Sequence, residues 1–207
     1  MTEQVKLPEV TKKRLVQLLQ LLNAWPNKKI TSADISTATG WKNSLIRHDF
    51  WLLGTNLKGV SNGYYVSDLQ AVITKALKLE TTTELQEKKN CCIVGLGRLG
   101  AALLDENLID GNLFSIKAGF DSNVYRVEIL RSTYPLYPAT EMDWVIKREK
   151  IEYAILTVQD VNAQQMCNRL IKAGIKGIVN MTNVMLKVPE SVKIENISIL
   201  NALKLVI

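Results

Sequence analysis

Leucines recur at helical spacing near the start of the chain, in a segment that ends at a proline. These positions lie three or four residues apart: Leu15, Leu18, Leu19 and Leu22. They predict a helix over Val10–Trp25, which Pro26 ends because proline cannot continue a helix. A second helix is predicted from a cap at Thr31 or Ser32 to Thr39.

A third helix is predicted over Lys42–Leu53, after a sharp turn at Gly40. It places four apolar residues on one face: Leu45, Ile46, Phe50 and Leu53. Two short helices joined by a tight turn, after a longer first helix, form a helix-turn-helix pattern. Asn62-Gly63 is a hairpin signal, so we expect Gly54–Val66 to form the two-stranded wing of a winged helix, followed by a helix over Asp68–Leu79.

The second part of the chain alternates continuous apolar strands with helices. The predicted strands are Cys91–Val94, Phe114–Phe120, Tyr153–Val158 and Gly177–Asn180, and the predicted helices are Leu99–Glu106, Glu141–Glu149 and Ala163–Ala173. Such alternation is typical of a parallel sheet covered on both faces. The predicted fold class is therefore α/β, with an N-terminal winged-helix domain (residues 1–80), a linker (81–90), a Rossmann-type parallel-sheet domain (91–194) and a C-terminal helix (195–207).

The last stretch, Ile197–Ile207, has an apolar face at helical spacing, formed by Leu200, Leu203 and Val206. This face can pack on a partner subunit or on its own domain, and the pattern does not choose between the two.

Residues Gly95 to Gly100 read Gly-Leu-Gly-Arg-Leu-Gly and join a predicted strand directly to a predicted helix. A helix start reached through a glycine turn aims unpaired N–H groups and a partial positive charge at one spot, where a pyrophosphate can bind. Gly95 permits the turn, Gly97 lets phosphates approach the backbone, and Gly100 lets helix and strand pack closely. The expected cofactor is NAD, and the candidate binding residues are Gly95, Leu96, Gly97, Arg98, Leu99, Gly100, Asp121 and Asn123.

Asp121 follows the second predicted strand at about the distance where a ribose-binding acid is expected. There it would accept hydrogen bonds from ribose hydroxyls and repel a 2′-phosphate, which favours NAD over NADP. The alternative is an ordinary turn residue before Ser122-Asn123. Both interpretations stay open on the sequence.

Charge is distributed unevenly along the chain, whose formal net charge is +6. Residues 1–90 hold 13 Lys and Arg against 8 Asp and Glu, and residues 91–207 hold 13 against 12. A basic first part predicts contact with a polyanion. No apolar stretch approaches the roughly 20 residues of a membrane span, and the start of the chain lacks a signal-peptide pattern, so we expect a cytoplasmic protein without membrane contact.

The third helix carries polar residues away from its apolar face, and these are the candidate DNA contacts. Lysine and arginine can contact phosphates, while Asn, Ser, Arg and His can bond base edges in the major groove. The candidates are Lys42, Asn43, Ser44, Arg47 and His48, with Lys58 of the wing. The alternative is a solvated helix face on which Arg47 pairs with Asp49 or another acid.

Three cysteines, Cys91, Cys92 and Cys167, are an odd count without metal-ligand spacing. Two of them fall in a predicted buried strand, which favours a small hydrophobic role over a redox-active thiol. No metal site is expected.

Motifs along nearly the whole chain resemble the redox-sensing transcriptional repressor (Rex) family. They are Arg14-Leu15, Ile46-Arg47-His48-Asp49, Gly63-Tyr64, Ile93 to Leu104, Phe120-Asp121, Ala173 to Asn180 and Val188-Pro189. The resemblance implies a homodimeric repressor that exchanges its terminal helix between subunits and binds a double-stranded DNA operator. It also implies that NADH closes the dimer and releases DNA, while NAD⁺ favours the DNA-bound state. This opposite effect on DNA binding requires only that NADH and NAD⁺ differ in their affinities for the two dimer geometries.

The chain departs from the family pattern at the implied interdomain switch, which joins an arginine, a tyrosine and an aspartate. Arg14 is present, but Glu106 and Ser198 stand where the family has Tyr and Asp. An Arg14–Glu106 ion pair is a possible substitute. Near the implied nicotinamide site, Val158-Gln159 replaces Val-Pro and Asn180-Met181-Thr182-Asn183 replaces Asn-Phe-Ala-Pro. Compared with the family pattern, the wing is one residue longer and has one basic residue fewer around Lys58.

Two alternatives to a redox-sensing repressor follow from these departures. The first is a divergent paralogue that binds DNA without sensing NADH, or that senses another nucleotide. The second is a small NAD-dependent reductase with a fused helical domain. Against an enzyme, the second half contains no histidine, and Lys187, Tyr153 and Tyr125 are its only weak acid/base candidates.

Overall fold

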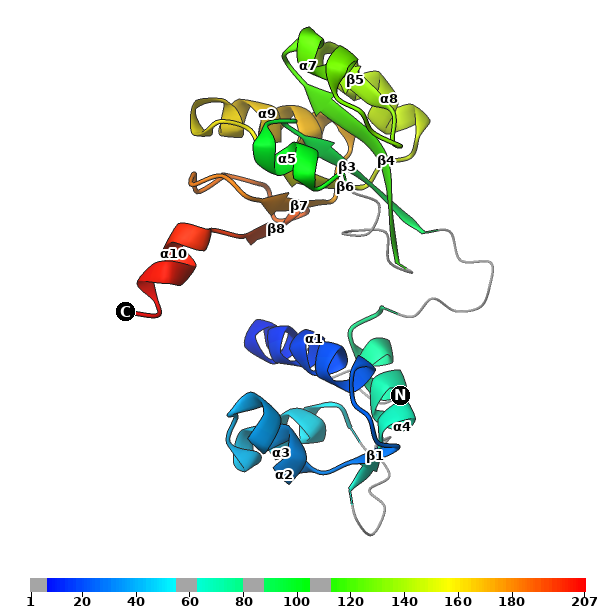
Figure 1. Cartoon of the computed structure of the whole chain (residues 1–207), viewed down its shortest axis with the longest axis vertical. Helices are drawn as coiled ribbons and strands as arrows, with labels where there is room; N and C mark the ends of the chain where they lie inside the picture. Colours follow the sequence, from blue (N-terminus) through cyan, green and yellow to red (C-terminus); the bar gives the residue numbers. More distant parts are fainter. Residues whose placement is uncertain (1–6, 55–62, 80–87, 105–112) are drawn as a thin grey trace. The chain divides into compact units, whose positions relative to one another are not determined.

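The computed structural model describes residues 7–54, 63–79, 88–104 and 113–207 (Figure 1). The chain divides into two compact units, residues 1–82 and 83–207, and each is described by itself. Among the described residues, no helix is both long and apolar enough to cross a lipid bilayer.

The first unit contains four helices and one small sheet among its described residues. The helices are α1 (Glu9–Asn23), α2 (Ser32–Thr39), α3 (Asn43–Leu52) and α4 (Val66–Ala76), and the strands are β1 (Lys29–Ile30) and β2 (Tyr64–Tyr65). Each helix turns its apolar residues into one core, which includes Leu15, Leu18, Ile35, Ile46 and Leu69. The predicted helical spacing is therefore the spacing of the buried side chains.

Local chemistry fixes both ends of α2. The Thr31 hydroxyl accepts a hydrogen bond from the Asp34 N–H at 3.1 Å, and the Asp34 carboxylate accepts one from the Thr31 N–H at 2.8 Å. This reciprocal capping box satisfies two N–H groups that the helix start leaves unpaired. Gly40 ends α2 in the left-handed conformation, with φ 73°, and directs the chain into α3.

Only the second strand of the predicted hairpin over Gly54–Val66 lies among the described residues, so the hairpin itself stays a prediction. Its described strand β2 pairs antiparallel with β1, a two-residue strand between α1 and α2 that is too short to show a periodic pattern. Gly63 explains the close approach, because a Cβ there would lie 2.4 Å from the carbonyl oxygen of Ile30. Residues 55–62, including Lys58, lie outside the described residues.

The second unit is built on a six-stranded parallel sheet in the order β5-β4-β3-β6-β7-β8. The central strands are β3 (Lys89–Val94), β4 (Phe114–Asp121), β6 (Tyr153–Leu156) and β7 (Gly177–Asn180), and the edge strands are β5 (Leu136–Pro138) and β8 (Lys193–Asn196). The chain leaves β3 to one side for β4 and later returns on the other side as β6. The carboxyl ends of β3 and β6 therefore flank the switch point, where ligands bind in folds of this kind.

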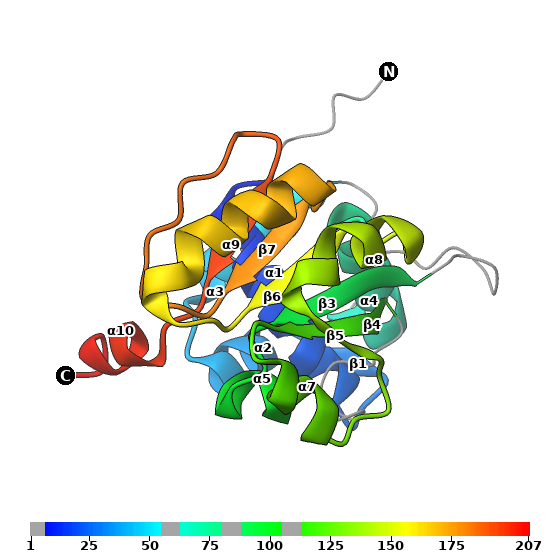
Figure 2. The same ribbon diagram turned by 90° about the horizontal axis from the view of Figure 1, so that it is seen from above.

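Helices cover both faces of this sheet (Figures 1 and 2). Helices α8 (Met142–Arg148) and α9 (Asp160–Ala173) pack on the face that carries Cys92 and Val94. Helices α5 (Arg98–Ala102) and α7 (Val124–Ile129) lie on the opposite face, where Cys91 and Ile93 are buried. Alternate residues of β3 thus serve two separate cores, as expected for a strand buried on both sides.

Several elements differ from the expectation. The strands β5 and β8 and the helix α7 were not predicted, and Lys89–Asn90 belong to β3 rather than to the linker. Helix α5 ends at Ala102 and β6 ends at Leu156, both earlier than predicted. The short 3-10 turn η1 (Ala139–Glu141) precedes α8. The final helix α10 (Ile199–Lys204) is shorter than Ile197–Ile207 and has no buried residues, so its apolar face does not pack on the described part of its own unit.

Candidate nucleotide and nucleic-acid interfaces

The glycine turn follows β3 at the switch point of the sheet. Gly95 has φ +95°, and a Cβ there would lie 2.8 Å from the backbone nitrogen of Val158. Gly97 precedes the first residue of α5 and faces open space, since a Cβ there would meet no atom within 4 Å. Open space at Gly97 is what the close approach of a phosphate needs.

Gly100 has the tightest surroundings in the turn. A Cβ at this position would lie 1.9 Å from the Gly95 carbonyl oxygen and 2.7 Å from Oγ1 of Thr157. The Thr157 hydroxyl donates to that same carbonyl oxygen at 2.6 Å. Thr157 therefore fastens the end of β6 to the turn. Sequence reasoning missed it, and no spacing rule links it to the glycines.

Leu96 has a structural part in the turn. Its side chain is buried in the core beneath α5, and its N–H donates to Oδ2 of Asp121 at 2.7 Å. That N–H is thus already bonded within the chain. Arg98 and Leu99, in contrast, are exposed at the start of α5. Cofactor contact at the six turn residues stays a prediction.

Asp121 connects three segments with one buried carboxylate. Besides the Leu96 N–H, it accepts from the N–H of Asn123 at 2.7 Å and from Nη1 of Arg126 at 3.0 Å. It is therefore more than an ordinary turn residue, and its binding of a ribose stays a prediction. Asn123 caps α7, with its side-chain oxygen 3.4 Å from the N–H of Arg126. Arg126 was not singled out in the sequence.

The carboxyl end of β7, near the implied nicotinamide site, is closed by side-chain hydrogen bonds. The buried Asn180 donates to the Val184 carbonyl at 2.8 Å and accepts from the Thr182 hydroxyl at 2.7 Å. Asn183 bonds Asp160 of α9 through its backbone N–H at 3.0 Å and its side-chain amide at 3.2 Å. Two of the substituted residues, Thr182 and Asn183, are thus hydrogen-bonded within the chain, to Asn180 and to Asp160. Gln159 directly precedes α9, and its side chain does not cap the helix.

Helix α3 presents its polar residues to solvent. Lys42, Asn43, Ser44, Arg47 and His48 are all exposed, while Ile46 and Phe50 enter the core. Trp51 lies on the same side, 72% exposed, with its ring 5.9 Å from that of His48. Sequence reasoning missed Trp51, although it follows Arg47 by four residues and therefore shares its helix face.

Arg47 does not pair with Asp49, because Asp49 forms its ion pair with Arg14. The Arg14 guanidinium donates to both carboxylate oxygens of Asp49, from Nε at 2.7 Å and from Nη2 at 2.6 Å. The Thr11 hydroxyl donates to the same carboxylate at 3.1 Å. The hydrogen bond to Asp49 raises the pKa of Arg14 above its ordinary value. This pair fastens α1 to α3 and leaves Arg47 free for other contacts.

The three predicted switch residues are only partly described. Arg14 is bound within its own unit, as given above, and Glu106 lies outside the described residues. Ser198 caps α10, with its hydroxyl oxygen accepting from the Asn201 N–H at 3.3 Å. An Arg14–Glu106 ion pair and an interdomain switch stay predictions.

The three cysteines are buried in the second unit. Burial raises the pKa of the Cys92 thiol, with a smaller contribution from Cys91, and burial also raises the pKa of Cys167. A raised pKa disfavours the reactive thiolate. Among the described residues, no group of three or more His, Cys, Asp or Glu could hold a metal ion.

Comparison with known protein families gives a match within the second unit. The family model of the CoA binding domain matches residues 86–184. Curated relatives extend over almost the whole chain. The redox-sensing transcriptional repressor Rex of Ligilactobacillus salivarius is 33% identical over 207 residues, covering 99% of this chain and 94% of the relative. Rex of Listeria monocytogenes is 32% identical, covering 100% and 94%.

Solved structures agree with this similarity. The structure of the Rex-family repressor RSP in complex with β-NAD⁺ and operator DNA matches with a TM-score of 0.84 and 29% identity, covering 97% of this chain and 91% of that one. The RSP complex with β-NADH matches with a TM-score of 0.82 at the same identity, covering 97% and 92%. The winged-helix and Rossmann-type architecture is thereby confirmed, and the chain belongs to the family of the redox-sensing transcriptional repressor Rex.

Proposed function

We propose that this protein is a DNA-binding transcriptional repressor whose affinity for a double-stranded operator changes with the NADH/NAD⁺ ratio. The observation that carries the proposal is similarity over the full chain to a repressor solved with NAD⁺ and operator DNA, and also with NADH. The exposed polar side chains of α3 and the open space at Gly97 support the two binding roles. A regulator of this kind acts on DNA in the cytoplasm.

Lys42, Asn43, Ser44, Arg47 and His48 are the proposed contacts to the operator, together with Lys58. Arg47 occupies the middle of the exposed face and has no ion-pair partner among the described residues. Arg47→Ala should weaken operator binding about tenfold or more, because a good base contact contributes about 1–3 kcal/mol. Dinucleotide affinity, measured by NADH fluorescence, should not change.

Lys75→Ala is the matched control, since it removes one positive charge from the same unit but from α4. It should reduce operator affinity far less than Arg47→Ala. Equal losses in the two variants would mean that net charge, rather than the α3 face, sets binding. A loss of NADH binding in Arg47→Ala would indicate a folding defect.

The redox response is tested by a mobility-shift titration of operator DNA with saturating NADH or NAD⁺. NADH should release the DNA at concentrations where NAD⁺ retains it. Equal DNA affinity with both forms would exclude redox sensing, and no DNA binding at low salt would exclude the repressor function itself.

A repressor that binds DNA without an NADH response is the second candidate. The loop at Asn180–Asn183 favours it, because the polar side chains of Asn180, Thr182 and Asn183 are already hydrogen-bonded within the chain. The same titration distinguishes the two candidates.

Catalysis is not part of the proposal, and the curated relatives are transcription regulators. The three weak acid/base candidates lie on separate elements. Tyr125 is exposed on α7, and Lys187 is exposed after β7. Tyr153, the first residue of β6, packs edge-on against Phe114 of β4. A test for NADH oxidation with simple carbonyl compounds should show no turnover.

We also propose a homodimer in which α10 packs on the partner subunit. Three apolar residues support it, because Ile199, Leu200 and Leu203 are more than half exposed on one short helix. Leu203→Asp should shift the mass measured by light scattering from dimer to monomer. An unchanged dimer would place the subunit contact elsewhere.

A further inference from the structure

The second unit has a pocket at the amino ends of its parallel strands, whereas the glycine turn lies at their carboxyl ends. It has a volume of about 390 Å³ and lies where β3, β6 and β7 begin, beside the ends of α8 and α9. Its apolar lining comes from Ile146, Ile151 and Ala173. The volume falls within the ~300–1,000 Å³ typical of small-molecule sites. Nothing in the proposed repressor function uses this pocket.

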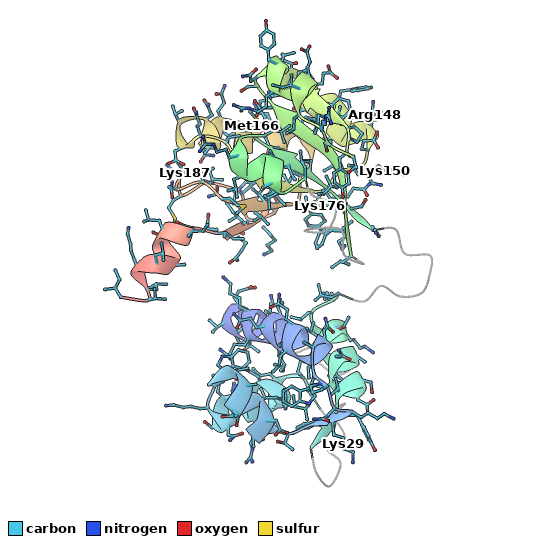
Figure 3. The ribbon with its side chains drawn as sticks, viewed as in Figure 1. Lys29, Arg148, Lys150, Met166, Lys176 and Lys187 are labelled. Atoms are coloured by element: carbon cyan, nitrogen blue, oxygen red, sulfur yellow. The ribbon has the colours of Figure 1, made fainter. Side chains whose placement is uncertain are left out.

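Five lysines and one acid line this lysine pocket: Lys88, Lys89, Lys147, Lys150, Lys176 and Glu152. Lys150 and Lys176 are labelled in Figure 3. Glu152 is already engaged, because it forms an ion pair with Lys176. Among the described residues, no carboxylate lies within ion-pair distance of Lys88, Lys147 or Lys150. At least three ammonium groups are therefore gathered around one small volume without a neutralising carboxylate among the described residues.

The lysines are not needed to cap the two helices that end there. The last carbonyls of α8 already accept backbone N–H groups, with Ile151 N bonded to Ile146 O at 2.9 Å and Glu149 N to Val145 O at 2.9 Å. In α9, Ile175 N bonds Leu170 O at 3.1 Å. Each helix end contributes only about −0.5 of an elementary charge. Two such ends cannot balance these three lysines, so the described residues give the pocket a net positive charge.

Gathered like charges repel one another and favour an anionic ligand. Lysine binds phosphate as a point charge through three rotatable donors. We propose that the lysine pocket binds a small ligand carrying two or more phosphate groups, with the apolar lining in contact with the rest of that ligand. Lys147 at the end of α8 and Lys150 in the turn after it hold the phosphates. The site is separate from the glycine turn and does not depend on it.

Tripolyphosphate is the probe, titrated into the full chain by calorimetry at low salt with saturating NADH, which occupies the glycine turn. The test variant is Lys147→Gln/Lys150→Asn, in which asparagine suits the left-handed backbone of residue 150, with φ 50°. We expect its Kd for tripolyphosphate to rise at least tenfold, because two of the unpaired charges are lost. The Kd of the unaltered chain should be the same with and without NADH.

Lys172→Gln/Lys187→Asn is the matched control, since it removes two exposed lysines of the same unit that do not line the pocket. Its Kd should stay within about twofold of the unaltered chain. Equal weakening in both double variants, no binding by the unaltered chain, or competition by NADH would each overturn the proposal.

A DNA arm separates free phosphates from backbone phosphates. The same variants are titrated with a random-sequence 20-base-pair duplex. Duplex affinity unchanged by Lys147→Gln/Lys150→Asn agrees with the proposal. A variant that loses duplex affinity while keeping tripolyphosphate affinity would show that these lysines contact DNA, and the proposal would be wrong.

Discussion

Helix α3 and the Gly95–Gly100 turn are both expected to meet phosphates, but the structure builds them in different ways. On α3, the contact groups are exposed side chains, and the buried pair between Arg14 and Asp49 only sets where the helix lies. In the turn, the expected contact groups are backbone atoms, and the side chains of Asp121 and Thr157 hold that backbone in place.

This difference decides how each surface tolerates change. A side-chain surface can lose one contact and keep its shape, because the helix beneath it is stabilised by its core. A surface made of backbone atoms is more sensitive, since a methyl group added at a tightly packed glycine displaces the backbone atoms that are expected to bind the ligand. We therefore expect mutations to have larger effects at the turn than on α3.

The largest effect should come from Gly100→Ala. Its Cβ would lie 1.9 Å from the Gly95 carbonyl oxygen, a backbone atom that cannot move without opening the turn. We expect a loss of about 3 kcal/mol in the free energy of unfolding of the second unit and no measurable NADH binding. Urea unfolding and NADH fluorescence are the measurements.

Gly97→Ala is the control for this prediction. No atom lies within 4 Å of a Cβ at position 97, so stability should be unchanged while dinucleotide binding weakens, because the methyl group occupies space that a phosphate needs. If both variants bound NADH normally, the turn would not be the cofactor site.

The outcome of the sequence analysis follows the same division between side chain and backbone. Periodic apolar side chains gave the helices of the first unit and the four central strands, because burial imposes a period that can be read without coordinates. Strand β5 has three residues, and β8 is a polar edge strand that pairs with β7 on one side only. Neither leaves a hydrophobic period.

The sites divide in the same way. The exposed face of α3 and the glycine turn could be predicted from local spacing. Three contacts could not be predicted in this way, because each depends on how separate segments pack. They are Arg14–Asp49, Thr157–Gly95 and Arg126–Asp121. The lysine pocket was missed for the same reason, since its lysines come from three separate segments.

Asp49→Asn should have the next largest effect, and it tests whether the α3 surface depends on a buried support. It removes the charge that Arg14 contacts through two hydrogen bonds. Breaking a fully buried pair costs about 3–5 kcal/mol, and we expect about 2 kcal/mol because the Arg14 side chain keeps 16% exposure.

Urea unfolding of the first unit measures this loss, and mobility shift should show weaker operator binding. Asp143→Asn is the control, because it breaks the exposed Asp143–Arg169 pair; such pairs contribute at most about 1 kcal/mol. Similar losses in the two variants would mean that burial of Asp49 adds nothing.

Thr157→Val should have a smaller effect on the turn. It keeps the shape of the side chain but removes the hydroxyl that donates to the Gly95 carbonyl at 2.6 Å. We expect a loss of about 1 kcal/mol in unfolding free energy and a modest rise in the Kd for NADH. Thr157→Ser keeps the donor and should restore most of both. A stable Thr157→Val protein with normal NADH affinity would show that the glycines alone shape the turn.

The smallest effect concerns the partly buried capping box at the start of α2, the helix that precedes α3. Hydrogen bonds from the side chain and backbone of Thr31 lower the pKa of Asp34 below its ordinary value. The folded state therefore gains stability from the charged carboxylate at neutral pH and loses it as the pH falls through the lowered pKa.

Asp34→Asn removes this pH dependence, so the difference in unfolding free energy between the unaltered protein and the variant should narrow on acidification. Urea midpoints measured from neutral to acidic pH test the prediction, with Thr31→Ser as a control that keeps the cap hydroxyl. A difference that stayed constant over this range would mean that the capping box works through its geometry and not through the charge of Asp34.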